Sequence, residues 1–270
     1  MNRREAGIDS LFSSRYCGAM ILKLPFCSLF RAVIFFSAIE ITLSATPKAT
    51  ADVPPPMATS RAAKSGLALA FTENFNGPNG ENLGVGWTQA AHYGVVNEQI
   101  LHHRLYFRIP SGHDIPWGSA TLDLANPSIL GHGLHPGDYF EVTLRRQSQE
   151  GGLGVELFDS DQLRVGSDLV RGASALMAWN GITWVPIAFD KKGTPLKFDW
   201  NTRHIIGVRF DSADGHRANF SYYLDGRYVG SWPVNRPETV LDKIGVYTQS
   251  KTSNAKFEFH DVKVYTRTRS

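Results

Sequence analysis

Three charged residues on two short segments are the best candidates to contact a ligand. Residues 139–145 and 153–157 alternate between apolar and polar side chains, as half-buried strands do. If their apolar side chains face a core, then Glu141, Arg145 and Glu156 face the other way. We expect these three residues to lie on neighbouring strands of one sheet. Carboxylate and guanidinium groups bond hydroxyl groups, so such a face suits a glycan.

Two tryptophans flank a turn signal and are candidates to stack on sugar rings. Asn180-Gly181 favours a type I′ turn, the tight two-residue hairpin. Such a turn would place Trp179 opposite Ile182 and Met177 opposite Trp184, so that both tryptophans share one sheet face. Indole rings offer flat apolar surfaces to the CH faces of sugars. The alternative is that both tryptophans lie in the core and that the charged residues form only a salt-bridged, solvated face.

The remaining reactive residues form no recognisable catalytic or metal-binding motif. No G-x-S-x-G sequence marks a serine nucleophile, and the nine histidines show no H-E-x-x-H or comparable metal spacing. His102 and His103 are adjacent, so they would point to opposite faces of a strand. We therefore expect no catalytic residue, no metal ligand and no cofactor.

The N-terminal 51 residues predict an export signal. Basic residues precede a short apolar run at 32–39, and Ala49-Thr50-Ala51 is a small-x-small cleavage pattern. Met20 is an alternative start, because Met20 to Ala51 alone has the usual proportions of a signal. We expect residues 1–51 to be removed, and an uncleaved anchor is the alternative. Removal predicts a secreted, periplasmic or cell-envelope location.

Cleavage would change the charge of the chain. Residues 1–51 hold six of the 28 basic and three of the 25 acidic residues, so 22 of each remain. Cys17 and Cys27 are also removed, and the mature chain therefore has no thiol and no disulfide. A neutral domain gives no electrostatic reason to expect nucleic acid or an anionic membrane as partner. No later stretch is apolar enough for a stable membrane span.

The rest of the chain predicts a flexible leader and one all-β domain. Residues 52–65 include Pro54-Pro55-Pro56 and predict the leader, and residues 66–270 the domain. Within the domain the dominant period is two, no window sustains a helical apolar stripe, and Gly and Pro recur every few residues. We expect a jelly roll, a sandwich of two antiparallel β-sheets packed face to face.

A second hairpin is predicted at Asp225-Gly226, again a type I′ signal. A two-residue turn would place Leu224 opposite Arg227 and Tyr222 opposite Val229. The core face of this hairpin would hold Phe220, Tyr222, Leu224 and Val229, and the other face Tyr223, Tyr228 and Trp232.

Three segments carry a family resemblance. They are Phe71-Thr72-Glu73-Asn74-Phe75-Asn76 with Leu83-Gly84-Val85-Gly86-Trp87, then Tyr222 to Gly230, and finally Ile244-Gly245-Val246 with Phe257 to Val264. Together they resemble the first strand, the Y-x-D-G-x-x-V-G hairpin and the closing strands of the concanavalin A-like lectin/glucanase (laminin G-like) superfamily. The bacterial 3-keto-disaccharide hydrolase-like domains share this sandwich and are a further candidate relative.

The resemblance implies the fold but not an activity, because the superfamily includes lectins, glucanases and adhesion modules. Its glucanases carry E-x-D-x-x-E on one strand of the concave sheet, and this chain lacks that pattern; the nearest candidate is Glu156-Leu157-Phe158-Asp159. Relatives also often hold a structural calcium between carboxylates of the first and last strands. Asp261 matches that position and Glu73 matches it loosely.

Three functions remain open from the sequence. The first is a carbohydrate-binding or adhesion module without catalysis, with a glycan as its partner on Trp179, Trp184, Glu141, Arg145 and Glu156. The second is a glycoside-processing hydrolase that uses carboxylates of the concave face. The third is a structural envelope protein without a small ligand.

Overall fold

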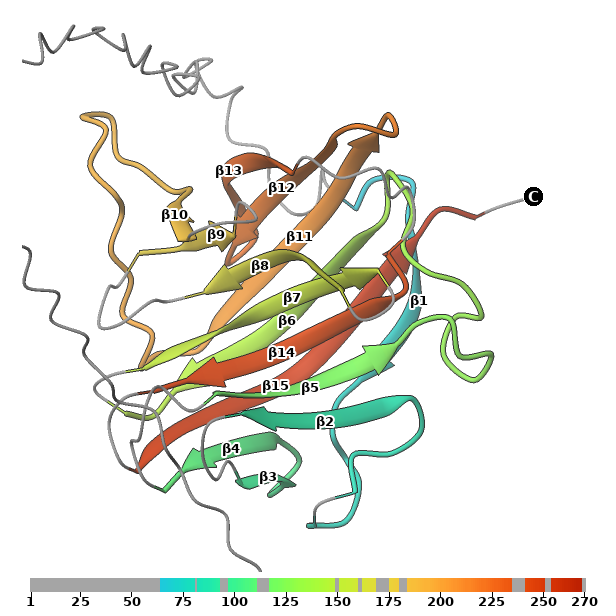
Figure 1. Ribbon diagram of the computed structural model, residues 1–270, viewed down its shortest axis with the longest axis vertical. Coiled ribbons are helices and arrows are strands. Elements are labelled where there is room, and N and C mark those ends of the chain that lie inside the picture. Colours follow the sequence, from blue (N-terminus) through green and yellow to red (C-terminus); the bar gives the residue numbers. More distant parts are fainter. Residues whose placement is uncertain are drawn as a thin grey trace, which may run out of the picture. The chain divides into compact units, whose positions relative to one another are not determined.

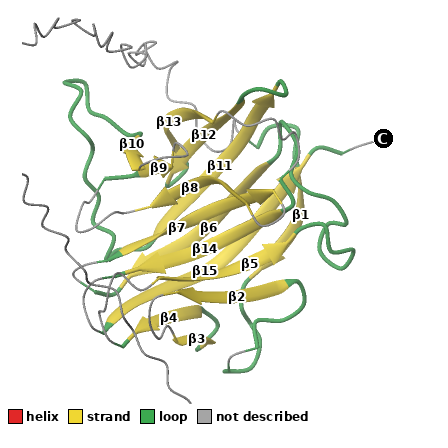
Figure 2. Ribbon diagram, viewed as in Figure 1, coloured by secondary structure: helices red, strands yellow, loops and turns green. Residues whose placement is uncertain are grey.

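The computed structural model describes residues 64–80, 82–92, 97–110, 117–148, 151–159, 162–168, 175–179, 184–234, 241–250 and 254–268. Over these residues the chain forms only strands, turns and loops (Figure 2). The chain divides into residues 1–50 and 51–270, and every described residue belongs to the second unit. The predicted signal and most of the predicted leader lie outside the described residues. Within the described part, no helix is long and apolar enough to cross a membrane.

The larger sheet, sheet A, has eight antiparallel strands (Figure 1). Their order is β13-β12-β11-β6-β15-β4-β3, and β1 pairs with β15 outside this path. The strands are β1 (Ala68–Glu73), β3 (Asn97–Ile100), β4 (Leu105–Ile109), β6 (Tyr139–Arg146), β11 (His204–Ala213), β12 (Ala218–Leu224), β13 (Arg227–Val234) and β15 (Ala255–Thr266).

The smaller sheet, sheet B, has seven strands in the order β10-β9-β8-β7-β14-β5-β2. They are β2 (Trp87–His92), β5 (Trp117–Asp123), β7 (Gly152–Asp159), β8 (Gln162–Asp168), β9 (Met177–Trp179), β10 (Trp184–Pro186) and β14 (Lys243–Gln249). All described pairings in it are antiparallel. Two antiparallel sheets confirm the predicted all-β sandwich.

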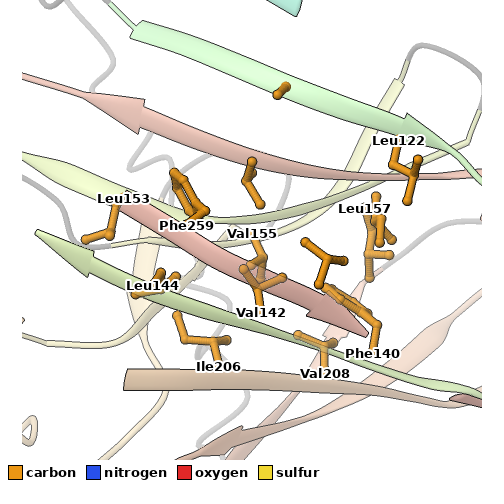
Figure 3. Packing of buried hydrophobic residues seen from close by; sticks show 14 of the residues in the cluster. Leu122, Phe140, Val142, Leu144, Leu153, Val155, Leu157, Ile206, Val208 and Phe259 are labelled. Atoms are coloured by element: carbon orange, nitrogen blue, oxygen red, sulfur yellow. The ribbon is translucent and has the colours of Figure 1, made fainter. Parts of the chain in front are cut away.

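The hydrophobic core lies between the two sheets. Figure 3 shows how side chains of β6 and β11 in sheet A pack with side chains of β7 in sheet B. The alternation in the sequence predicted the inward side chains correctly, because every second residue of a strand points to the same face. Those confirmed as buried are Phe140, Val142, Leu144, Val155 and Leu157. On β11, Ile206, Val208 and Phe210 alternate in the same way and are also buried.

The second predicted hairpin is present, with one change of register. Asp225 and Gly226 have φ angles of +49° and +79°, as a type I′ turn requires, and Leu224 pairs with Arg227. A bulge follows, and it pairs Tyr222 with Gly230 in place of the predicted Val229.

The same bulge changes which residues of β13 face the core. Phe220, Tyr222 and Leu224 are buried as predicted, and Val229 packs against the core. Tyr223 and Tyr228 lie on the other face, also as predicted. Trp232 was expected beside them, but it pairs with Phe220 and packs against the core. The extra residue of the bulge shifts β13 by one position and so turns Trp232 inward.

Candidate functional site

The three predicted charged residues do not share a face, which corrects the expectation from the sequence. Glu141 and Arg145 lie on β6 in sheet A, whereas Glu156 lies on β7 in sheet B. Each points away from the core, as predicted. Because β6 and β7 are consecutive strands in different sheets, their outward faces lie on opposite sides of the sandwich. Alternation predicts which way a side chain faces but not which sheet its strand joins.

Glu141 is engaged by neighbours from its own chain. Its carboxylate accepts hydrogen bonds from the hydroxyls of Tyr139 and Tyr265 at 3.3 and 3.1 Å, and it pairs with the Lys64 ammonium at 2.6 Å. The Lys64 nitrogen also lies 4.5 Å from the centre of the Tyr265 ring. These contacts attach residue 64, just ahead of the predicted domain start, to the outer face of sheet A.

Arg145 is likewise held by a partner in sheet A. Its Nε and Nη2 atoms donate to Oε2 of Glu258 at 3.0 and 2.7 Å. Arg104 binds the other oxygen of the same carboxylate at 2.9 Å. Arg145 therefore belongs to a group of charges on the opposite sheet from Glu156.

The two tryptophans pair directly, and this corrects the predicted register. Trp184 lies opposite Trp179, and Pro186 lies opposite Met177. Residues 180–183, including the Asn180-Gly181 signal, lie outside the described residues. The connection is thus four residues long and not two. A register shift of two residues leaves every position on the same face of the sheet, so Trp179 and Trp184 still occupy positions on one face.

Sheet B brings Trp184 together with Tyr247, a residue that the sequence analysis missed. Their rings are 6.2 Å apart between centroids and 15° from parallel. Yet β10 and β14 are separated by three strands, which corresponds to roughly 19 Å at the usual strand spacing. Both side chains must therefore lean inward across β7 and β8, on the outer face of sheet B.

Beneath this aromatic pair the sheet surface is mostly bare backbone. On β7 the outward positions before Glu156 are Gly152 and Gly154. Across the strands, Glu156 lies opposite Gly245 of β14 and Gly166 of β8. Glycine has no side chain, so Glu156 is flanked on both neighbouring strands by bare backbone. We call Glu156, Trp184, Tyr247 and the four glycines the sheet B site.

The carboxyl group of Glu156 is buried although it faces away from the core. The residue is 8 % exposed, and no hydrogen bond or ion pair joins it to another residue of the described part. Burial raises its pKa from 4.5 to about 8. Because the aromatic pair crosses the same strip of sheet, we infer that these rings shield the carboxyl from water. At neutral pH the group keeps its proton and both donates and accepts hydrogen bonds.

The two carboxylates suggested for calcium are both engaged by groups of the chain. Glu73 accepts a hydrogen bond from the Phe75 backbone at 2.6 Å, and Asp261 is paired with Lys263 at 2.7 Å. Within the described residues, no group of three or more His, Cys, Asp or Glu side chains could hold a metal ion.

Comparison with known proteins gives a likeness in fold only. No family model matches the sequence, and no curated protein is significantly similar to it. Solved structures do match. A sialidase has a TM-score of 0.52 at 12% identity, over 74% of this chain and 18% of that chain. A GlcNAcα1-4Gal-releasing endo-β-galactosidase from Clostridium perfringens has a TM-score of 0.51 at 12% identity, over 76% and 64%.

A glycosyl hydrolase family protein from Mycobacterium fortuitum matches with a TM-score of 0.52 at 14% identity, over 73% of this chain and 99% of that one. The chain thus spans less than two thirds of the sialidase and the endo-β-galactosidase but nearly all of the mycobacterial protein. These likenesses and the two stacked antiparallel sheets show that the chain has the concanavalin A-like lectin/glucanase fold.

Proposed function

We propose that this protein is a carbohydrate-binding module and that a glycan binds at the sheet B site. The partly exposed Trp184 would supply the stacking surface, with the buried Tyr247 ring packed against it, and Glu156 would bond a sugar hydroxyl. Where the two rings do not cover them, the glycine positions carry no side chain, so a sugar ring could approach the backbone there.

The observation that carries this proposal is the carboxyl of Glu156. Burial raises its pKa to about 8, so at neutral pH the carboxyl keeps a proton. In that form it can donate a hydrogen bond to a sugar hydroxyl and also accept one. Flat apolar rings around a few polar groups are typical of small-molecule sites. Glycosidases with a similar fold also act on carbohydrates, which supports a carbohydrate as the class of ligand.

Binding tests this proposal directly. A glycan array should identify retained neutral oligosaccharides, and calorimetry should then compare the parent with Trp184→Ala. We expect about a ten- to hundredfold weaker affinity, because loss of one stacked ring corresponds to roughly 1–3 kcal/mol. Tyr228→Ala, an aromatic truncation on sheet A, serves as the matched control and should leave affinity unchanged. Unchanged affinity in a folded Trp184→Ala protein would contradict the proposal, and so would an array without retained glycans, which favours a structural role.

A second candidate function, glycoside hydrolysis, is favoured by one observation. A general acid must hold a proton near neutral pH, and the pKa of Glu156 is raised to about 8. Asp168 pairs with Gly154 and so occupies a diagonal register position two residues from Gly166, the partner of Glu156. Inverting and retaining hydrolysis both require a pair of carboxyl groups.

Glu156→Gln separates binding from hydrolysis. The amide keeps a donor and an acceptor but has no transferable proton, so a binding module should keep its affinity within a few fold. A hydrolase should lose release of reducing sugars by a hundredfold or more. We expect no release from β-1,3- or β-1,3-1,4-glucan by the parent, since E-x-D-x-x-E is absent. Release that Glu156→Gln abolishes would establish the hydrolase instead.

A further inference from the structure

The outer face of sheet A carries a second group of residues, at the end formed by β4, β15 and β6. Leu105 and Phe107 of β4 are in the core, so Arg104, Tyr106 and Arg108 alternate with them and point outward. On β15, Lys256 lies opposite Arg108 and Glu258 lies opposite Tyr106. Arg145 of β6 lies on the other side of Glu258. We call Arg104, Tyr106, Arg108, Lys256 and Arg145 the arginine strip.

Glu258 fixes two members of the strip in place. Its side chain is only 4 % exposed, and it binds Arg104 at 2.9 Å and Arg145 at 2.7 Å and also Gln147. Burial alone would raise the pKa of Glu258, but its bonds to Arg145 and Arg104 hold it below the usual value. The two arginine side chains remain 35 % and 31 % exposed. Their heads are therefore ordered by the carboxylate and still open to solvent.

The strip has more positive charge than its one carboxylate neutralises. Four cations lie on or beside β4, β15 and β6 around Glu258, but only Arg104 and Arg145 pair with it. The neighbouring Asp261 is already paired with Lys263 at 2.7 Å. His260 adds no charge at neutral pH, because burial and nearby arginines, Arg203 first among them, lower its pKa to about 4. A mature chain with 22 basic and 22 acidic residues thus concentrates positive charge at one end of sheet A.

We propose that the arginine strip binds an acidic glycan, one that carries carboxylate or sulfate groups. Guanidinium forks match the planar oxygens of such groups bidentately. Tyr106 stands between two arginines on the same strand and supplies a ring for a sugar to stack on. Four cations are few for a nucleic acid, whose binding proteins often neutralise six to ten phosphates or so. The strip lies on the opposite sheet from the sheet B site and does not depend on it.

Calorimetry on the full chain in about 0.15 M salt tests the strip. The probes are a galacturonic acid hexasaccharide, a heparin hexasaccharide and neutral cellohexaose. We expect at least one acidic probe to bind and the neutral one to leave the strip empty. The double variant Arg108→Gln/Lys256→Gln should lose tenfold or more in affinity for that acidic probe. Neither of these residues binds Glu258, so the fold should be kept.

The matched control is Arg217→Gln/Arg227→Gln, which removes two exposed charges at the far end of sheet A and should change affinity less than twofold. Tyr106→Ala should also weaken the affinity of the protein for the acidic hexasaccharide. Trp184→Ala should not affect acidic probes, so this result is separate from that of the sheet B site. Failure of both acidic probes to bind, an equal loss in the control, or tighter binding to a DNA hexamer or phosphatidylserine vesicles would each overturn the proposal.

Discussion

Two glutamates, Glu98 and Glu156, are buried without a charged partner in the described part of the chain. Glu98 lies on β3 opposite Phe107 and so faces the core; it is 7 % exposed, and neither of its oxygens has a hydrogen-bond partner. Burial raises the pKa of each carboxyl from 4.5 to about 8. The neutral form of both is therefore the form that the fold favours.

This burial predicts a dependence of stability on pH. A carboxyl that keeps its proton up to about pH 8 when folded, but only to about 4.5 when unfolded, makes the native state bind more protons between those values. Its stabilising effect is then present below pH 4.5 and lost as the pH rises toward 8. In Glu98→Gln that loss should be absent.

Denaturant unfolding at pH 5 and pH 8.5 measures this effect. Between pH 5 and pH 8.5, the free energy of unfolding of the parent should fall by about 2–4 kcal/mol more than that of Glu98→Gln. One pKa unit corresponds to about 1.4 kcal/mol. Comparison with the variant removes the separate contribution of His260, whose lowered pKa acts in the opposite direction. Parallel curves for parent and variant would show that Glu98 ionises normally in the fold.

At the scale of the element, the sequence predicted the direction of side chains and the positions of turns better than the register between strands. The Asp225-Gly226 turn and the buried alternate residues were confirmed, because backbone conformation and side-chain facing are local properties. The bulge that turns Trp232 inward and the four-residue connection at 180–183 were not predicted. Nor was the turn at His102 and His103, where both residues have positive φ angles of 50° and 60° in place of the predicted strand. Such features depend on packing against strands distant in sequence.

Gly226→Val should destabilise the fold by about 1–3 kcal/mol. A β-branched residue resists the φ of +79° that this position adopts in the turn. Chemical denaturation checks the loss. Gly226→Asn is the control and should cost less, because asparagine tolerates positive φ. Equal midpoints for the parent and Gly226→Val would mean that the turn does not require this conformation.

Gly230→Ala should destabilise by a similar amount for a different reason. An added Cβ atom would overlap the backbone oxygen of Ile187, so β13 or the segment after β10 must move. Overpacking of this kind typically costs about 1–3 kcal/mol. The exposed neighbour Ser231 offers the control, and Ser231→Ala should melt within a degree or two of the parent. A Gly230→Ala protein with the same melting temperature would show that the two segments separate easily.

At the scale of the whole molecule, the sequence predicted the sandwich but not which candidate residues share a sheet. Glu156 and Trp184 are on one sheet face as expected, but Glu141 and Arg145 are on the other sheet. Tyr247 was missed because it is 63 positions away from Trp184 in the chain and lies on a strand that does not pair with that of Trp184. No local pattern encodes such a long-range arrangement.

We also propose that the protein is exported and that its mature form begins near Asp52. The motive is the Ala49-Thr50-Ala51 pattern behind an apolar run. Sequencing of the N-terminus of the exported protein should start within a few residues of Asp52. A thiol assay should find no cysteine, since Cys17 and Cys27 precede that point. An exported form that retains Cys27 would contradict cleavage at this site.

The pairing of β1 with β15 also affects when the sandwich can fold. Ala68 lies opposite Thr266, so the first strand of sheet A waits for almost the last residues of the chain. β15 in turn hydrogen-bonds to β4 and β6, which leaves three strands incomplete until it arrives. Contacts of such high sequence separation fold slowly. A chain emerging from the ribosome therefore cannot complete sheet A until β15 has been synthesised.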